Sequence, residues 1–174
     1  SFHETKNIIS GEGGALLINN PTFSERSEII REKGTNRSQF FRGKIDKYSW
    51  VDIGSSYLPS DIIAAFLWAQ ICKAEEITSL RMNAWNKYHE LLSEFESKGM
   101  LTRPHVPSEC AHNAHMYYVL LDEGKNRDDI IRKLDSVGIN AIFHYVPLHS
   151  APQGLRSGRI SGSMSNTDDV SRKI

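Results

Sequence analysis

A long stretch between Pro59 and Gly99 constrains the fold most, because its apolar residues recur at helical spacing. Ser60 is the predicted N-cap, and Asp61 suits the positive end of a helix dipole. Two stripes of residues at helical spacing follow: Ile62, Phe66, Ala69 and Lys73, then Leu80, Ala84, Tyr88, Leu91 and Phe95. We therefore predict a long helix that breaks near residues 73–76 and ends at Gly99.

The residues before this helix predict one strand, one helix and one long loop. Residues 13–19, GGALLIN, form a short apolar run bounded by Gly and Asn-Asn-Pro, which is typical of a buried strand. A helix capped by Thr22 or Ser24 should run to about Lys33, and Gly34 stands where a left-handed residue ends a helix. Residues 35–54 are polar, basic and aromatic without a clear period, so we expect a surface loop.

The residues after the helix predict a small α/β domain. Residues 103–113 contain two prolines and mark a boundary. A strand (MYYVLL), an amphipathic helix closed by Gly138 and a second strand (NAIFHYV) follow. A last helix should begin at Asn166 or Thr167, and the chain stops within that pattern. This ending, together with a first strand that has no partner upstream, predicts a segment of a longer protein.

Charge and cysteine content narrow the classes of partner. The chain has 21 Lys and Arg against 21 Asp and Glu, so its net charge gives no pull toward nucleic acid or an anionic membrane. No apolar stretch reaches the ~20 residues of a membrane span, and no signal peptide is visible. Cys72 and Cys110 lie far apart, which indicates free thiols and a cytoplasmic setting.

Lys6 is the first candidate for chemistry. A lysine is ordinarily a solvated surface residue. Here Ser1, His3, Thr5 and Asn7 surround one amine, and a glycine cluster precedes an apolar run. A desolvated amine is nucleophilic toward carbonyls, and a nearby hydroxyl suits a phosphate, as a pyridoxal phosphate (PLP) site requires.

Other constellations are weaker. Cys110, His112 and His115 have metal-ligand character, but no fourth zinc ligand stands at a usual spacing. We therefore expect no metal site there and interpret these residues as part of a polar loop. No Ser-His-Asp order, GxGxxG motif or P-loop is present.

Several motifs carry a resemblance to a known family. The runs SFHETKN with GEGGALLIN, REKGTNRSQFFRGKIDKYSWVDIGSSYLPSDIIAAFLWAQ, NAHMYYVLL, FHYVPLH and SRKI resemble the DegT/StrS-type sugar nucleotide aminotransferases, which are fold-type I PLP enzymes. This resemblance implies an α/β fold that corresponds to the C-terminal part of such an enzyme. Residues 1–58 would end the large PLP-binding domain, residues 59–102 would form the connecting helix, and residues 103–174 would form an incomplete small domain.

The resemblance also implies roles for individual residues. Lys6 matches the Schiff-base lysine, and Ser1 matches the phosphate-binding serine. Ser56 stands where the family usually has an Asn that reaches the phosphate of the other subunit's cofactor. The substrate-binding residues implied by the match are Arg37, Phe40, Arg42 and His149. Guanidinium groups and aromatic rings suit a nucleotide diphosphate.

The implied reaction is transfer of an amino group from L-glutamate to C4 of a nucleotide-linked 4-keto-6-deoxy sugar. The run of residues 31–70 implies a substrate of the dTDP-4-keto-6-deoxyglucose type and the product dTDP-4-amino-4,6-dideoxygalactose, used in surface polysaccharide and lipopolysaccharide synthesis. A homodimer with shared active sites is expected. Two alternatives are a PLP-dependent sugar dehydratase, whose members replace the lysine with histidine, and a non-catalytic fragment able only to fold and dimerise.

Overall fold

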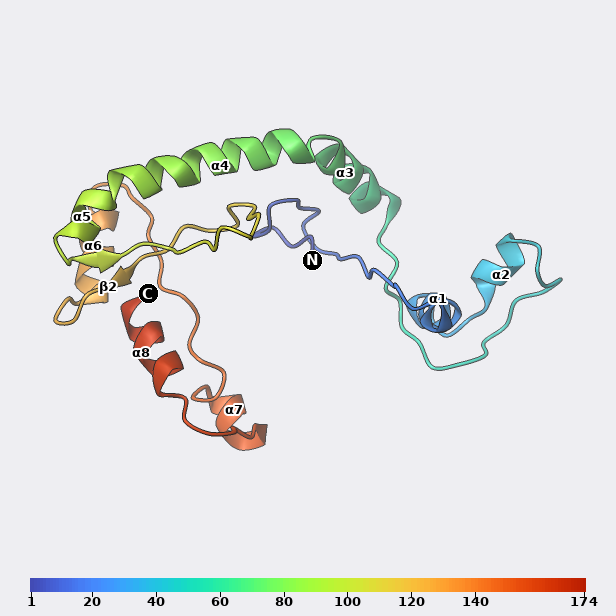
Figure 1. Ribbon diagram of the computed structural model, residues 1–174. Coiled ribbons are helices and arrows are strands. Elements are labelled where there is room, and N and C mark those ends of the chain that lie inside the picture. The colour runs from blue at the N-terminus through green and yellow to red at the C-terminus, as the bar shows by residue number, and fades with distance from the viewer. The chain divides into compact units, whose positions relative to one another are not determined.

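The computed structural model describes residues 1–174, which form two compact units, Ser1–Thr78 and Ser79–Ile174 (Figure 1). The first unit contains a 3₁₀ turn η1 (Pro21–Phe23) and the helices α1 (Ser24–Arg31), α2 (Arg37–Phe41) and α3 (Asp61–Cys72). Helix α4 (Ala74–Leu91) continues into the second unit, which also holds α5 (Ser93–Ser97), β1 (Leu101–Thr102), β2 (Leu120–Leu121), α6 (Arg127–Asp135), α7 (Pro152–Ser157) and α8 (Ser165–Lys173). None of these helices is sufficiently long and apolar to span a membrane.

Helix α1 begins differently from the prediction. The Asn20 side chain accepts a hydrogen bond from the Thr22 backbone N–H at 3.0 Å, and Pro21 starts the turn before α1. Neither Thr22 nor Ser24 caps the helix. The helical turns begin earlier, at Pro21, because proline has no N–H that needs an acceptor and its fixed φ suits the first position of a helix. The predicted left-handed residue at Gly34 is confirmed, with a φ of 76°.

The predicted strand over residues 13–19 is wrong. These residues form no ladder, and Leu16 and Leu17 are exposed. A strand exists only where a neighbour satisfies its backbone N–H and C=O groups, and the first unit contains no other strand. The prediction of a loop after Gly34 holds for most of residues 35–54, although α2 interrupts it.

The central helical region follows the prediction closely. Ser60 Oγ accepts a hydrogen bond from Ile63 N at 3.3 Å, which confirms the N-cap of α3. The predicted break falls at Lys73, between α3 and α4, and Gly99 with a φ of 66° follows α5. Helix α3 is apolar on nearly every side, yet none of its residues is buried.

The second unit holds one small sheet. Strands β1 and β2 pair antiparallel, with Leu101 opposite Leu121. The predicted strand over residues 116–121 is therefore reduced to two residues, and the predicted strand over residues 140–146 is wrong because it finds no partner. Helix α6 and the left-handed Gly138 after it are confirmed, and Asn126 Oδ1 caps α6 by accepting from Asp129 N at 3.1 Å.

The best-packed part of the second unit is an aromatic cluster around Trp85, which is 9% exposed. The Trp85 ring stacks on His89 at 4.7 Å and meets His112 at 4.6 Å and Tyr117 at 5.3 Å edge to face. Trp85 is therefore packed in the second unit, whereas Trp68 on α3 is 67% exposed.

Nearby hydrogen bonds hold the backbone that covers Trp85. Arg81 Nε donates to the Ala114 carbonyl at 3.1 Å, and its Nη2 donates to the His115 carbonyl at 2.6 Å. Ala114 is buried with a φ of 49°, a conformation that is uncommon for a residue other than glycine. One arginine of α4 thus satisfies two carbonyls of the segment that carries His112.

Candidate functional site

Residues 1–14 form a loop that folds back on itself and carries Lys6. Phe2 N donates to the Gly13 carbonyl at 2.8 Å, and Ser10 N donates to the Phe2 carbonyl at 2.7 Å. Lys6 N donates to the His3 carbonyl at 2.9 Å, which closes a tighter turn inside the loop. The two outer bonds join the ends of the loop, and Lys6 lies on the turn between them.

The side chains of this loop form a local network around the turn. His3 Nδ1 accepts from Thr5 N at 3.3 Å, and His3 Nε2 lies 3.6 Å from Glu12 Oε1. Ser10 is buried and its hydroxyl donates to the Glu12 carbonyl at 2.7 Å. Lys6 is half-buried and takes part in none of the ion pairs, so its amine is available to react with a carbonyl group.

The same loop brings a hydroxyl close to the glycine cluster. Ser1 Oγ accepts from His3 N at 3.4 Å, and a Cβ added to Gly14 would lie 3.9 Å from Ser1 Cα. Gly13 has a φ of 140°, which few other residues adopt. An amine, a hydroxyl and open glycine backbone on one loop fit a cofactor that carries an aldehyde and a phosphate.

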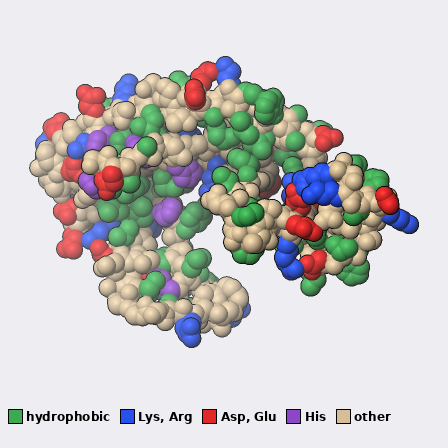
Figure 2. Space-filling model, turned by 45° about the vertical axis from the view of Figure 1, so that its right-hand side comes forward, with side chains coloured by type: hydrophobic (Ala, Val, Ile, Leu, Met, Phe, Trp, Pro, Cys, Tyr) green, Lys and Arg blue, Asp and Glu red, His purple; other side chains and the backbone are tan.

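The segment after α1 places the predicted substrate-binding arginines in ion pairs with Glu28 of that helix and with Glu32, which follows its last residue. Arg42 donates to both carboxylate oxygens of Glu28, at 2.8 and 2.5 Å. These hydrogen bonds lower the pKa of Glu28, and the same pairing raises the pKa of Arg42. Arg37 Nη1 donates to Glu32 Oε1 at 2.7 Å. Acidic and basic side chains accordingly alternate over this part of the surface (Figure 2).

Aromatic rings accompany these arginines. The Arg37 guanidinium lies 4.8 Å from the centre of the Phe41 ring, and the Phe40 ring lies 5.6 Å from that of Tyr48. The structure therefore brings Arg37, Phe40 and Arg42 together on α2 and at its end. Ser56 is exposed, and its backbone forms an isolated bridge with Glu32.

His149, the last predicted site residue, belongs to the second unit. Its Nε2 lies 2.8 Å from Asp168 Oδ1 in α8. Sequence reasoning missed Asp168, as it missed Glu28 and Glu32, because none of them has a motif of its own. The acidic pair in NTDDVSRKI was the available signal for Asp168, since a carboxylate in a first helical turn is favourable.

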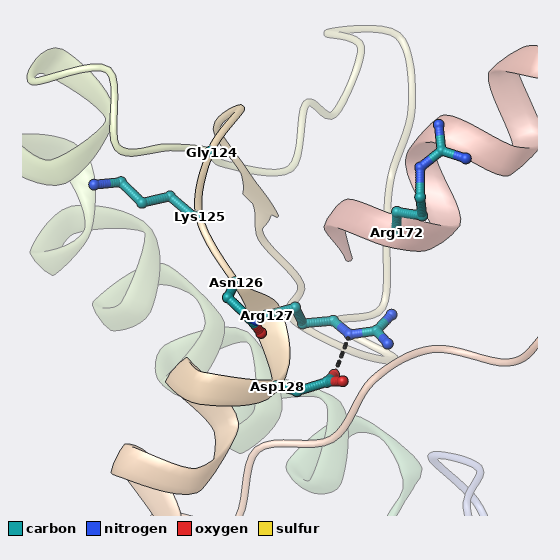
Figure 3. Close-up of a pocket in the computed structure, with 6 residues that line it drawn as sticks. All are labelled: Gly124, Lys125, Asn126, Arg127, Asp128 and Arg172. Carbon is teal, nitrogen blue, oxygen red and sulfur yellow. Dashed lines mark hydrogen bonds and ion pairs between the residues drawn. The ribbon is translucent and has the colours of Figure 1, made fainter.

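The second unit also has two surface hollows. One, of about 440 Å³, lies at the start of α6 and is lined by Gly124, Lys125, Asn126, Arg127, Asp128 and Arg172. Its basic groups do not converge, because Lys125 extends away from Arg127 and Arg172, and Arg127 pairs with Asp128 (Figure 3). The other, of about 490 Å³, lies between residues 144–148 and α8.

Among the residues Cys110, His112 and His115, the structure gives His112 a packing role. His112 packs edge to face on Trp85. The structure contains no group of three or more His, Cys, Asp or Glu side chains placed to hold a metal ion. Both cysteines are free and exposed.

Comparison with known proteins supplies the family. The model of the DegT/DnrJ/EryC1/StrS aminotransferase family matches residues 1–174. The uncharacterized protein MJ1066 of Methanocaldococcus jannaschii is 31% identical over 158 residues, covering 87% of this chain and 40% of that protein. The GDP-perosamine synthase of Caulobacter vibrioides is 30% identical over 156 residues, with 87% and 39% covered.

A solved structure shows the same fold. PseC of Helicobacter pylori, an aminotransferase involved in the biosynthesis of pseudoaminic acid, superposes with a TM-score of 0.83 at 23% identity, over 99% of this chain and 45% of that chain. The chain thus spans about two fifths of the curated relatives and less than half of this structure. The predicted fold, the partial fold of a PLP-type aminotransferase, is confirmed.

Proposed function

Because the chain belongs to the DegT/DnrJ/EryC1/StrS aminotransferase family, we propose that the full-length protein is a PLP-dependent aminotransferase that acts on a nucleotide-linked keto sugar. The observation that carries this proposal is the closed loop of residues 1–14. It presents the Lys6 amine without a carboxylate partner and keeps the Ser1 hydroxyl on the same loop.

When bound, PLP would supply an electron sink for chemistry at an amino acid's α-carbon. Lys6 Nζ would hold the cofactor covalently; once the donor's amino group has displaced it, the freed amine would be the base that takes the proton from the donor's α-carbon. Ser1 Oγ donates a hydrogen bond to the phosphate, and Ser56 offers a second hydroxyl to the cofactor of the other subunit. Arg37 and Arg42 bind the diphosphate of the substrate, Phe40 offers a flat apolar face, and His149 contacts the sugar nucleotide.

We further propose the substrate class that the sequence resemblance implies. The amino acceptor is a sugar of the dTDP-4-keto-6-deoxyglucose type, the donor is L-glutamate, and the product enters surface polysaccharide and lipopolysaccharide synthesis in the cytoplasm. The name of the Caulobacter relative points instead to a GDP-linked sugar. Initial rates with the dTDP-linked and GDP-linked 4-keto-6-deoxy sugars, each with L-glutamate, separate the two. A higher kcat/KM for the GDP-linked sugar would overturn the dTDP assignment.

The role of Lys6 has a direct chemical test. Borohydride reduction of the full-length protein with PLP should leave a pyridoxyl group on Lys6, and Lys6→Ala should abolish both this adduct and turnover. Lys73→Ala is the matched control, since Lys73 is an exposed lysine of the same unit that lies outside residues 35–56 and its replacement should leave both unchanged. An adduct that persists in Lys6→Ala on another lysine contradicts the assignment. Lys6 also argues against the dehydratase alternative, whose members carry histidine at this position.

We also propose a homodimer whose active sites are shared between subunits, because residues 35–56 are too polar and aromatic for an idle linker and the family resemblance implies that they cross to a second subunit. A Lys6→Ala subunit mixed with an Arg42→Ala, Ser56→Ala subunit should regain activity, since one of the two sites then has both intact halves. A full-length protein that is active as a monomer would refute shared sites. If the family's reaction is absent while the chain still dimerises, the fragment alternative is favoured.

A further inference from the structure

His149 lies on a turn whose backbone is held firmly by the start of α7. Ser150 N and Ala151 N both donate to the Pro147 carbonyl, each at 3.1 Å. A Cβ added to Gly154 would come within 1.7 Å of the Leu148 carbonyl oxygen, so the helix backbone lies directly against this turn. The backbone of His149 therefore has little freedom, and the orientation of its ring depends on its side-chain contacts.

Asp168 supplies the contact that orients the ring. Its backbone N–H donates to the Met164 carbonyl at 3.0 Å, which fixes it at the start of α8. Its Oδ1 lies 2.8 Å from His149 Nε2, and the side chains are 44% and 14% exposed, respectively. The neighbouring Asp169 pairs instead with Lys173, whose Nζ lies 2.8 Å away.

This contact determines which imidazole nitrogen carries the proton. An ionised carboxylate only accepts hydrogen bonds, so Nε2 must be the donor. The Nδ1 atom of a neutral ring then presents a lone pair. Nδ1 has no hydrogen-bond partner, and the structure leaves no buried side-chain nitrogen unsatisfied, so Nδ1 is open to solvent.

We propose that Asp168 is a positioning residue that holds His149 with Nδ1 presented as an acceptor for a hydroxyl group of the sugar substrate. This inference rests on the proposed function, which assigns His149 to the sugar nucleotide. A lone pair at Nδ1 accepts a hydrogen bond from a hydroxyl, whereas an ionised phosphate oxygen has no hydrogen to donate. The neutral ring in this tautomer therefore recognises the sugar and not the diphosphate. If the contact between His149 and Asp168 only attached α8 to the turn, its loss would affect the reaction with the amino donor and the reaction with the sugar substrate alike.

The test uses the full-length protein and separates its two half-reactions. Asp168→Ala should raise the KM for the nucleotide sugar about tenfold, the equivalent of one lost hydrogen bond. It should leave the single-turnover reaction of the PLP form with the amino donor unchanged. Asp168→Asn should restore most of the KM, because its amide oxygen can still accept from Nε2. The double variant with both His149→Ala and Asp168→Ala should have the same KM for the nucleotide sugar as His149→Ala alone.

Asp169→Ala is the matched control, because it removes the same charge from the same helix without touching His149. The proposal is overturned if Asp168→Ala keeps the wild-type KM, slows both half-reactions equally, or behaves as Asp169→Ala does. Nitrogen-15 spectra of His149 give a readout that does not depend on turnover. They should show the Nε2–H tautomer in the wild type and a mixture in Asp168→Ala. A wild type that fails to react with any amino donor refutes the proposed function, while these spectra still test the role of Asp168.

Discussion

Replacing Trp85 with alanine should remove the largest single contribution to the packing of the second unit. A tryptophan buries roughly 150–250 Å², and since Trp85 is only 9% exposed nearly all of that area is withdrawn from water. At about 25 cal/mol per Å² this area corresponds to ~4–6 kcal/mol. An alanine side chain still buries part of this area, so Trp85→Ala should lower the free energy of unfolding by about 3–5 kcal/mol.

Urea unfolding of the 174-residue chain, followed by circular dichroism at 222 nm, measures this loss. Trp68→Ala is the matched control, because it removes the same side chain from a neighbouring helix where it is 67% exposed. The control should change the free energy of unfolding by no more than about 0.5 kcal/mol. If Trp85→Ala costs no more than Trp68→Ala, the cluster around Trp85 does not stabilise the fold and the reasoning is refuted.

Three further predictions concern other residues of the two units. Burial lowers the pKa of His89, and Arg103 adds a smaller effect in the same direction. The stability that the neutral His89 provides is therefore complete above a pH of about 6.5, the ordinary pKa of histidine in an unfolded chain. It is lost as the pH falls through the lower pKa of the folded state. Urea titrations in that pH window should show this loss in the wild type and not in His89→Asn. Gly34→Ala places a Cβ 1.8 Å from the Asp52 carbonyl oxygen, whereas the Cβ of Gly43→Ala meets nothing within 4 Å at a similar φ. Gly34→Ala should therefore lower the free energy of unfolding by more than the ~1–2 kcal/mol expected for Gly43→Ala. Equal losses in the two variants would contradict the close contact at Gly34. Ser60→Ala should lower the free energy of unfolding by ~1 kcal/mol by removing the cap of α3, and an unchanged urea midpoint would exclude that role.

Local signals in the sequence predicted the helices well. Ser60 caps α3 because its hydroxyl reaches an N–H three residues away, and Gly99 and Gly138 follow helices because they adopt positive φ. These interactions lie within a few residues of one another, so the sequence pattern contains both partners. The helix break at Lys73 was predicted from the same local pattern.

Nonlocal structure was predicted poorly. The runs at 13–19 and 140–146 have strand composition, but a strand also needs a neighbour that composition cannot identify. Trp68 and Trp85 look equivalent in the sequence, and only the fold buries one of them. For the candidate site, the motif around Lys6 was recognisable, whereas the pairing of His149 with Asp168 spans 19 residues and required the structure.

The ion pairs of Arg42 with Glu28 and of Arg37 with Glu32 would make the proposed binding of a diphosphate at that segment an exchange of one set of ion pairs for another. A diphosphate that takes these guanidinium groups must displace the carboxylates of Glu32 and Glu28, which already hold them. Added salt screens the displaced pairs and the new pairs alike. The affinity for such a ligand should therefore depend on ionic strength less steeply than at a site whose arginines are free, and the released carboxylates should repel a ligand that carries additional negative charge.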